Sequence, residues 1–211
     1  MSKLNPVLEK MFAIFELIVS FLIINLLIVV LSIVSLFLLY PVLISGIFYI
    51  LRRIIKFKEY DSLLINYFTF VKKNIVSSLL AGILPMTLSF VIVLTVIFVN
   101  PLMIDIINDS YIVVIQIVQL IMLYILSSVL FISLIQVAHL IKKDNTIIIR
   151  DSFLILFAKP IRSLLAFMSI FLFGYYLFSF IDLYFIVFAI PILMSLYYII
   201  IYSNIDHYNA D

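Results

Sequence analysis

Long apolar stretches without charge dominate the pattern of hydrophobic and polar positions in this chain. The first runs from Leu17 to Leu51, and an α-helix needs only about 20 such residues to cross the hydrocarbon core of a bilayer. Further stretches lie at 75–99, 111–141, 160–179 and 183–202. They lack the charged face that an outer helix of a soluble protein carries. The pattern therefore predicts an all-α fold, a polytopic membrane helix bundle that forms one transmembrane domain over residues 1–211.

The first stretch is too long for a single crossing. As one continuous helix it would measure about 50 Å, against roughly 30 Å of hydrocarbon. Pro41 removes a backbone donor and Gly46 weakens the helix further, so we expect a break at Pro41. This predicts a first span at 17–40 and a short helix from Val42 to Lys56 that leaves the bilayer. A tight hairpin of two spans is the alternative.

Prolines and turn residues divide the later stretches. Pro85 lies inside the second span and is expected to kink it, and Asn100 and Pro101 favour a turn at its end. Only Ile181 and Asp182 separate the last two stretches, which predicts a tight helical hairpin. The chain then holds about five transmembrane helices, with short cytoplasmic amphipathic helices between them.

Composition supports a membrane location. Of the 211 residues, 67% are hydrophobic and 11% are charged, whereas soluble domains carry about 25% charged residues. Trp is absent and only three Gly occur, so GxxxG-type helix contacts are not expected, and Tyr, Lys and Arg must anchor the interface. The net charge of +2 gives no reason to expect nucleic acid as a partner.

The basic residues indicate an orientation. Eleven of the 13 Lys and Arg lie in two segments, 52–74 and 142–162, whereas the turn at 100–110 carries acids and no base. Under the positive-inside rule both basic segments are cytoplasmic. With five spans the N-terminus is then outside, although Lys3 and Lys10 fit that placement poorly.

The segment from Asp61 to Asn74 is predicted to be an amphipathic helix. Because spans begin within one turn of it, its apolar residues cannot all be buried against them, so we expect this helix along the membrane interface or against a partner. Lysines near its end suit anionic lipid headgroups. The candidate docking residues are Tyr67, Phe68, Val71, Lys72 and Lys73.

An internal repeat emerges at a shift of 85 residues, which aligns Phe68 with Phe153 and the Ser-Leu-Leu-Ala sequence 78–81 with 163–166. It predicts two copies, 61–141 and 146–203, each an amphipathic helix followed by two spans in the same orientation. Chance similarity between Leu-rich sequences is the alternative.

Several short motifs recur along the first part of the chain. They comprise Asn25, then Pro41, Val42 and Gly46, then Tyr49 and Arg52, then Phe68, Lys73, Asn74, Ser78 and Leu79. Together these motifs resemble the YesL family, a bacterial membrane-protein group defined by domain of unknown function 624. Ile44 and Ile47 stand where the family pattern has Thr and Pro, and its Trp after the Asn is missing. The resemblance covers nearly the whole chain and implies a bacterial plasma membrane location, association with carbohydrate uptake by ABC transporters, and no catalytic residue.

Polar residues inside membrane spans are candidate functional groups. Asn25 and a seam of Gln116, Gln119 and Ser127 are predicted to hydrogen-bond between helices, with contact to a permeating solute as the alternative.

Gln136 and His139 lie one turn apart near the end of the third span. A proton relay would need a second titratable group at membrane depth, so an interfacial His capped by backbone or water is preferred.

No sequence signature of catalysis is present: HExxH, GxSxG, P-loop and Rossmann motifs are all missing. We therefore expect no enzyme activity, no cofactor and no metal. The leading hypothesis is a non-catalytic accessory protein of the bilayer that docks on ABC transporter subunits through its basic amphipathic helices. The alternative is a small solute transporter or channel acting alone, using Asn25, Gln116 and Gln119.

Overall fold

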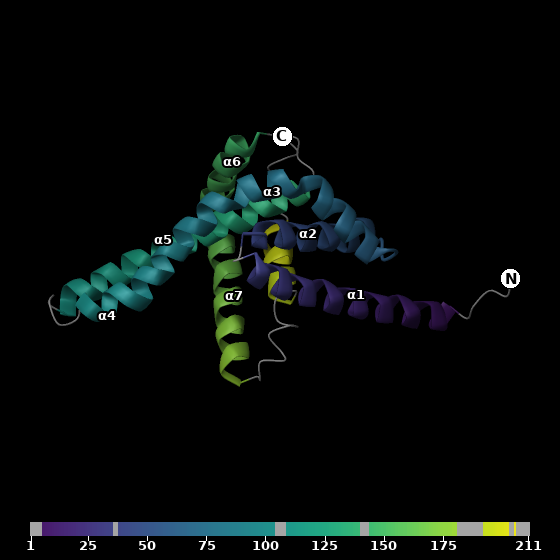
Figure 1. The fold of residues 1–211 in the computed structure, drawn as a ribbon, viewed down its shortest axis with the longest axis horizontal. Helices are drawn as coiled ribbons and strands as arrows, with labels where there is room; N and C mark the ends of the chain where they lie inside the picture. The colour runs from purple at the N-terminus through teal and green to yellow at the C-terminus, as the bar shows by residue number, and fades with distance from the viewer. Residues whose placement is uncertain are drawn as a thin grey trace.

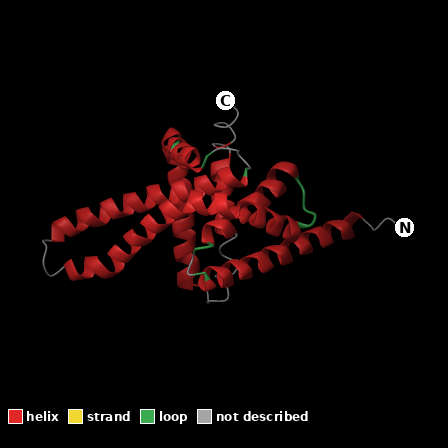
Figure 2. Cartoon of the chain, turned by 45° about the horizontal axis from the view of Figure 1, so that its top comes forward, coloured by secondary structure: helices red, strands yellow, loops and turns green. Residues whose placement is uncertain are grey.

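The computed structural model describes residues 6–35, 38–103, 109–139, 144–180, 192–202 and 205, which form helices and short connections, with no strand among them (Figure 2). The all-α prediction is confirmed for this part of the chain. The α-helices are α1 Pro6–Val34, α2 Tyr40–Arg52, α3 Leu63–Leu94, α4 Asn100–Met103, α5 Asp109–Ala138, α6 Asn145–Ala158 and α7 Pro160–Phe180. Two π-helical turns, η1 Arg53–Phe57 and η2 Thr95–Val99, continue α2 and α3, and a further helix covers Ile192–Tyr202.

Two helical stretches are long and apolar enough to cross a membrane, fewer than the five that were predicted. They are Leu63–Val99, which joins α3 to η2, and Tyr111–Ala138 within α5. A third is obtained if α6 and the first part of α7, bent by 99° at their junction, count as one span. The run 183–202 contributes only its last part, because residues 181–191 lie outside the described ranges.

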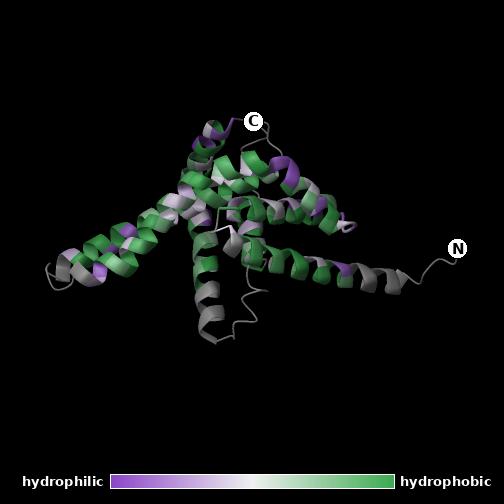
Figure 3. Cartoon of the chain, in the orientation of Figure 1, coloured by the Kyte–Doolittle hydropathy of each residue, from purple (hydrophilic) through white to green (hydrophobic). Residues whose placement is uncertain are grey.

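The two long helices form a hairpin that extends away from the other elements (Figure 1). Its surface is hydrophobic along most of its length (Figure 3), and large apolar side chains such as Phe90, Phe98, Val114 and Ile117 are exposed on it. Soluble monomers rarely expose apolar surface on this scale, whereas lipid chains cover it without cost. The hairpin therefore has the surface of a membrane-embedded element.

Helix α2 lies at the centre of the fold, contrary to the expectation that residues 42–56 form a short helix leaving the bilayer. Every residue from Pro41 to Phe48 is buried, and α2 contacts α1, α3 and α5. A helix that is apolar on all sides is stable where other helices surround it. Pro41 occupies the first turn of α2, where its missing N–H has no helical partner to lose.

The chain reverses direction between α1 and α2 (Figure 1). Helix α1 ends at Val34 and α2 begins at Tyr40, one residue before the predicted break at Pro41. The half of α1 that lies far from this turn, around Glu16 and Ser20, borders the beginning of α3 at Ser62. The described part of the run 17–51 thus folds as two antiparallel helices, and the number of times this run crosses the bilayer stays a prediction.

Small residues bring α2 and α3 together. A Cβ built on Gly46 would stand 2.5 Å from the Tyr67 ring, and one on Gly82 would stand 2.5 Å from Pro41. Between these points the buried Ser45 and Ser78 hydroxyls share a hydrogen bond of 2.7 Å. Ser78 and Gly82 form a small-xxx-small pair, the close packing typical of membrane helices. The expectation from scarce glycine that such contacts would be missing is wrong, because serine fills the second small position.

The break in α3 lies at Asn74 rather than at Pro85. Inside α3, non-helical dihedral angles occur at Asn74, with φ −115° and ψ 18°, where its side-chain amide donates to the Phe70 carbonyl at 3.0 Å. Such local bonds compete with the helical pattern. Pro85 is accommodated within the helix, and η2 and α4 carry the helical conformation past Asn100 to Met103 instead of the predicted turn.

The predicted repeat recurs in the position of the breaks. Lys159, which ends α6, has non-helical angles of φ −138° and ψ 67°, and it is the residue equivalent to Asn74 at the shift of 85. In each copy a helix with one face against its neighbour is followed by a break and a longer apolar helix.

Equivalent positions of the two copies also share their burial. At five pairs of equivalent positions, the residue of the first copy and the residue of the second copy are both buried. Leu80 and its equivalent Leu165 are both exposed. Chance similarity in composition gives no reason for this agreement in three dimensions. The buried pairs are Leu63 and Ile148, Tyr67 and Ser152, Phe70 and Ile155, Ser78 and Ser163, and Ala81 and Ala166.

Candidate functional site

Two regions gather the chemistry-bearing residues of the described chain. One is the outer face of the first half of α3, next to the connection 58–62. The other is a buried polar cluster where the end of α5 meets α6 and the helix Ile192–Tyr202. The first region offers a surface, and the second offers enclosed polar groups.

The first half of α3 presents a different face from the one predicted. Tyr67 is fully buried and donates its hydroxyl to the Leu43 carbonyl of α2 at 3.2 Å. Val71 is half-buried, and its methyl lies 2.9 Å from the position that a Cβ on Gly46 would take. Only Phe68 of the three apolar candidates is exposed, at 46%. Tyr67 and Val71 thus pack against α2, which was expected elsewhere, whereas Phe68 stays exposed, so the three residues are not all buried.

Helical spacing explains which residues α2 covers. Leu63, Tyr67 and Phe70 follow one another at intervals of four and three, so they share a stripe, and all three are buried. Phe70 stacks on Tyr49 of α2 with ring centroids 4.4 Å apart. Phe68, Lys72 and Lys73 lie off this stripe.

The exposed side of this region is basic and aromatic. Its exposed basic, aromatic and aliphatic residues are Lys56, Phe57, Lys58, Tyr60, Ile65, Phe68, Lys72 and Lys73, and the acids Glu59 and Asp61 of the connection are exposed beside them. Arg53 is paired with Glu59 at 2.5 Å and therefore contributes less free charge. Aromatic and basic side chains gathered at the start of a long apolar helix are typical of a membrane interface.

The predicted polar seam exists only in part. Gln119 exchanges two hydrogen bonds with Asn100, the Asn100 amide donating at 2.8 Å and the Gln119 amide at 3.3 Å. This pair closes the α3–α5 hairpin. Gln116 is exposed, and the Ser127 hydroxyl donates to the Leu123 carbonyl of its own helix. Asn25 lies in α1, and its side chain is outside the described part.

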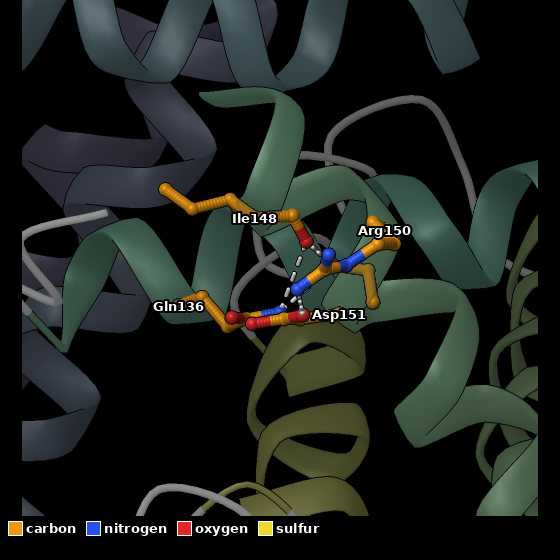
Figure 4. A network of polar contacts seen from close by, with 5 residues as sticks. Gln136, Ile148, Arg150 and Asp151 are labelled. Carbon is orange, nitrogen blue, oxygen red and sulfur yellow. Dashed lines mark hydrogen bonds and ion pairs between the residues drawn. The ribbon is translucent and has the colours of Figure 1, made fainter. Parts of the chain in front are cut away.

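Gln136 anchors the buried cluster and is fully buried. Its amide nitrogen donates to the Ser152 hydroxyl at 2.9 Å and to the Ile148 carbonyl at 3.3 Å, both on α6 (Figure 4). Ser152 in turn donates to Ile148 at 2.7 Å, so the amide orientation is fixed. Gln136 Oε1 has no hydrogen-bond donor within the described ranges. A buried acceptor of this kind is costly.

His139 follows one turn later and lies beside the helix Ile192–Tyr202. Its Nε2 lies 2.9 Å from the Tyr198 hydroxyl, and its ring also meets that of Tyr202. Lys56 stands over the other side of the cluster, 5.9 Å from the Tyr202 ring centroid. The preferred assignment of a His capped by backbone or water therefore needs revision, because a tyrosine hydroxyl is a partner.

Asp151 is the buried residue that sequence reasoning missed. It is 2% exposed on α6, next to Ser152, and the exposed Arg150 reaches it at 3.3 Å (Figure 4). Its spacing from Ile148 and Ile155 places it on the same helix face as these buried residues, which was the available signal. An ionisable group enclosed in a membrane protein is a functional candidate by default.

The described residues contain no group of three or more His, Asp or Glu that would hold a metal ion. The buried cluster is instead a hydrogen-bonding site with one carboxylate, one imidazole and tyrosine hydroxyls. In comparisons with protein-family models, with curated proteins and with solved structures, none matched this chain. The resemblance to the YesL family therefore stays an expectation from the motifs.

Proposed function

We propose that this chain is an integral membrane protein without catalytic activity. It acts as an accessory subunit that presents the exposed face of the first half of α3 to a partner, at the cytoplasmic side of a bacterial plasma membrane. The observation that carries this is the division of that helix into two faces. One face is fixed to α2 through Tyr67, while Phe68, Lys72 and Lys73 remain uncovered beside it.

The antiparallel arrangement of α1 and α2 supports a revised count of crossings. With α1 and α2 as a hairpin, the second to fifth apolar stretches bring the total to six. An even number of crossings puts both termini on one side, and all 13 Lys and Arg are then cytoplasmic, including Lys3 and Lys10. With 13 residues, α2 is about 20 Å long. A helix this short is tolerated because other helices enclose it.

The partner is a membrane complex whose cytoplasmic surface is acidic and apolar. Phe68 supplies an aromatic anchor, and the two lysines supply charge for recognition and orientation. The resemblance stated above suggests the subunits of a carbohydrate ABC transporter. Nothing in the described geometry requires that particular partner, so the experiment must identify it.

Co-purification tests this proposal. A mild detergent extract should yield a stoichiometric partner with the wild-type chain, and Phe68→Ser combined with Lys72→Gln should release it while the protein remains inserted. Ile161→Ser is the matched control, because Ile161 is also an exposed apolar residue at the start of an apolar helix. Retention of the partner by the Phe68 variant, or release by the control, would contradict the docking face.

The buried cluster favours a second candidate function, that of a small transporter acting alone. Gln136, Asp151 and His139 are enclosed polar groups, and such groups inside a membrane protein are candidates for a solute pathway. A transporter would show solute flux in liposomes that contain only the purified chain, and Gln136→Leu would abolish that flux. Liposomes without flux, together with a co-purifying partner, would exclude this second function.

A further inference from the structure

The buried cluster holds one polar atom whose partner is not among the described residues. Gln136 is fully buried on α5, and its Oε1 receives no hydrogen bond there. Its amide nitrogen is satisfied, because it donates to the Ser152 hydroxyl at 2.9 Å and to the Ile148 carbonyl at 3.3 Å on α6. The unpaired oxygen therefore belongs to an amide whose orientation is already fixed. A buried acceptor without a donor points to a bound ligand.

A carboxylate lies on the part of α6 that holds this amide. Asp151 is 2% exposed and stands between Ile148 and Ser152, the two residues that bind the Gln136 amide (Figure 4). Arg150 reaches one oxygen of the carboxylate at 3.3 Å, but the Arg150 side chain is 70% exposed. Ion pairs with exposed partners are weak, and Arg150 gives no hydrogen bond to Gln136 Oε1. The junction of α5 and α6 thus keeps a buried negative charge close to a buried acceptor.

Ser152 supplies a third oxygen. It donates its only proton to the Ile148 carbonyl at 2.7 Å and accepts one hydrogen bond from Gln136. Since a hydroxyl oxygen has two lone pairs, one remains for a further partner. Three oxygens that accept, one of them in a buried carboxylate, are stabilised most by a positive charge. The missing partner is therefore a cation.

Enclosure and charge limit which cation fits. Gln136, Asp151 and Ser152 are between 0% and 2% exposed, so an organic cation has no room among them. Oxygen ligands suit hard metal ions rather than soft ones. One carboxylate carries too little charge for a divalent ion, and the described residues contain no cluster of three or more His, Asp or Glu to add to it. Because Arg150 pairs with Asp151 in its ionised form, a metal ion is favoured over a proton.

We propose that the junction of α5 and α6 binds a sodium ion through the Asp151 carboxylate, Gln136 Oε1 and Ser152 Oγ. The exposed Arg150 marks the side from which the ion enters. A site for a monovalent ion has no sequence motif, so the expectation of no metal, drawn from missing motifs, did not cover it. The site rests on the buried cluster alone, and it is the same whether the chain docks on a partner or carries a solute.

Thermal unfolding of the purified full chain in detergent tests the site, in sodium chloride and in choline chloride of the same ionic strength. A ligand that binds only the folded state raises the unfolding temperature. Sodium at about ten times its dissociation constant should raise it by about 3–6 °C relative to choline, which is too large to be enclosed. Asp151→Asn and Gln136→Leu should each remove this difference. Asp144→Asn, which changes an exposed carboxylate just before α6, should keep it.

The difference between the two salts is measured within one variant, so a general change in stability does not mimic it. In choline chloride Gln136→Leu should be at least as stable as the wild type, because it removes the acceptor that lacks a donor. This variant therefore keeps the test valid even where Asp151→Asn does not fold.

Equal unfolding temperatures of the wild type in both salts, or an unchanged difference in Gln136→Leu, would overturn the proposal. Acidification in choline chloride is the remaining comparison. A rise in unfolding temperature that equals the effect of sodium, and that Asp151→Asn lacks, would show that the site takes up a proton instead of sodium and would overturn the proposal as well.

Discussion

The Ser133 hydroxyl of α5 lies 3.1 Å from the Ala81 carbonyl of α3, and this carbonyl is the one that Pro85 leaves without its helical donor. Ser133 also lies 2.8 Å from the Leu130 carbonyl, so its single proton is shared between the two acceptors. In a membrane, neighbouring serines often satisfy the backbone groups that a proline frees. The contact explains why Pro85 does not break α3.

Replacing Ser133 with Ala should destabilise the protein by about 1–3 kcal/mol, because the buried Ala81 carbonyl then has no donor. Pro85→Ala restores the N–H at position 85, so the double variant should lose less than Ser133→Ala alone. Unfolding in mixed micelles measures both. Ser169→Ala is the control, since Ser169 donates only to the Ala166 carbonyl of its own helix at 2.8 Å. If Ser133→Ala destabilised the wild type and the Pro85→Ala variant equally, the proposed interaction between Ser133 and the carbonyl freed by Pro85 would be contradicted.

Gly46 is one of two points, with Gly82, at which a glycine lets α2 and α3 approach closely. Gly46→Ala places a methyl 2.5 Å from the Tyr67 ring, and overpacking of this kind costs about 1–3 kcal/mol. Gly46→Ala combined with Tyr67→Leu should recover part of the loss, because the ring that clashes has gone. The same thermal unfolding assay checks this. A Gly46→Ala variant as stable as the wild type would show that the two helices separate easily.

For the buried polar cluster we predict no loss of stability on substitution, in contrast to the variants of Ser133 and Gly46. Gln136→Leu with His139→Ile replaces two buried polar side chains with aliphatic ones, and it removes a buried acceptor that has no donor in the described part. We expect the unfolding temperature to stay equal or to rise, because buried polar groups are often less stabilising than apolar ones of similar size. A fall in stability equal to that of Gly46→Ala would mean that the cluster is structural.

Hydropathy predicted well where the helices begin and end, but it did not predict which helices pack against one another. The boundary between an amphipathic segment and a span at Asn74, and the start of α7 at Pro160, follow from Asn, Lys and Pro in the sequence. The burial of α2 and of Tyr67 does not. Lipid chains and protein interiors are equally apolar, so an apolar face does not say which of the two it meets.

Asp151 was missed for a related reason. It stands in a segment with Arg150 and Lys159, which reads as a solvated, basic connection. Its spacing from Ile148 and Ile155 was the one local signal of burial, and the packing of α6 against α5, which encloses this face, cannot be predicted from the local sequence. The repeat at a shift of 85 residues could be proposed from a few matching residues in the sequence. The equivalent breaks at Asn74 and Lys159 could be found only from the backbone dihedral angles.

Labelling of single cysteines in intact cells tests the central claim most directly, namely a membrane protein whose α1–α2 hairpin brings the N-terminus to the side of the basic segments. The natural chain has no cysteine, so Ser2→Cys, Lys58→Cys and Asn108→Cys each report one position. We predict that an impermeant maleimide labels Asn108→Cys from outside, and labels Ser2→Cys and Lys58→Cys only after the membrane is opened. Labelling of Ser2→Cys from outside with Lys58→Cys protected would contradict the hairpin, and labelling of Lys58→Cys from outside would contradict the orientation altogether.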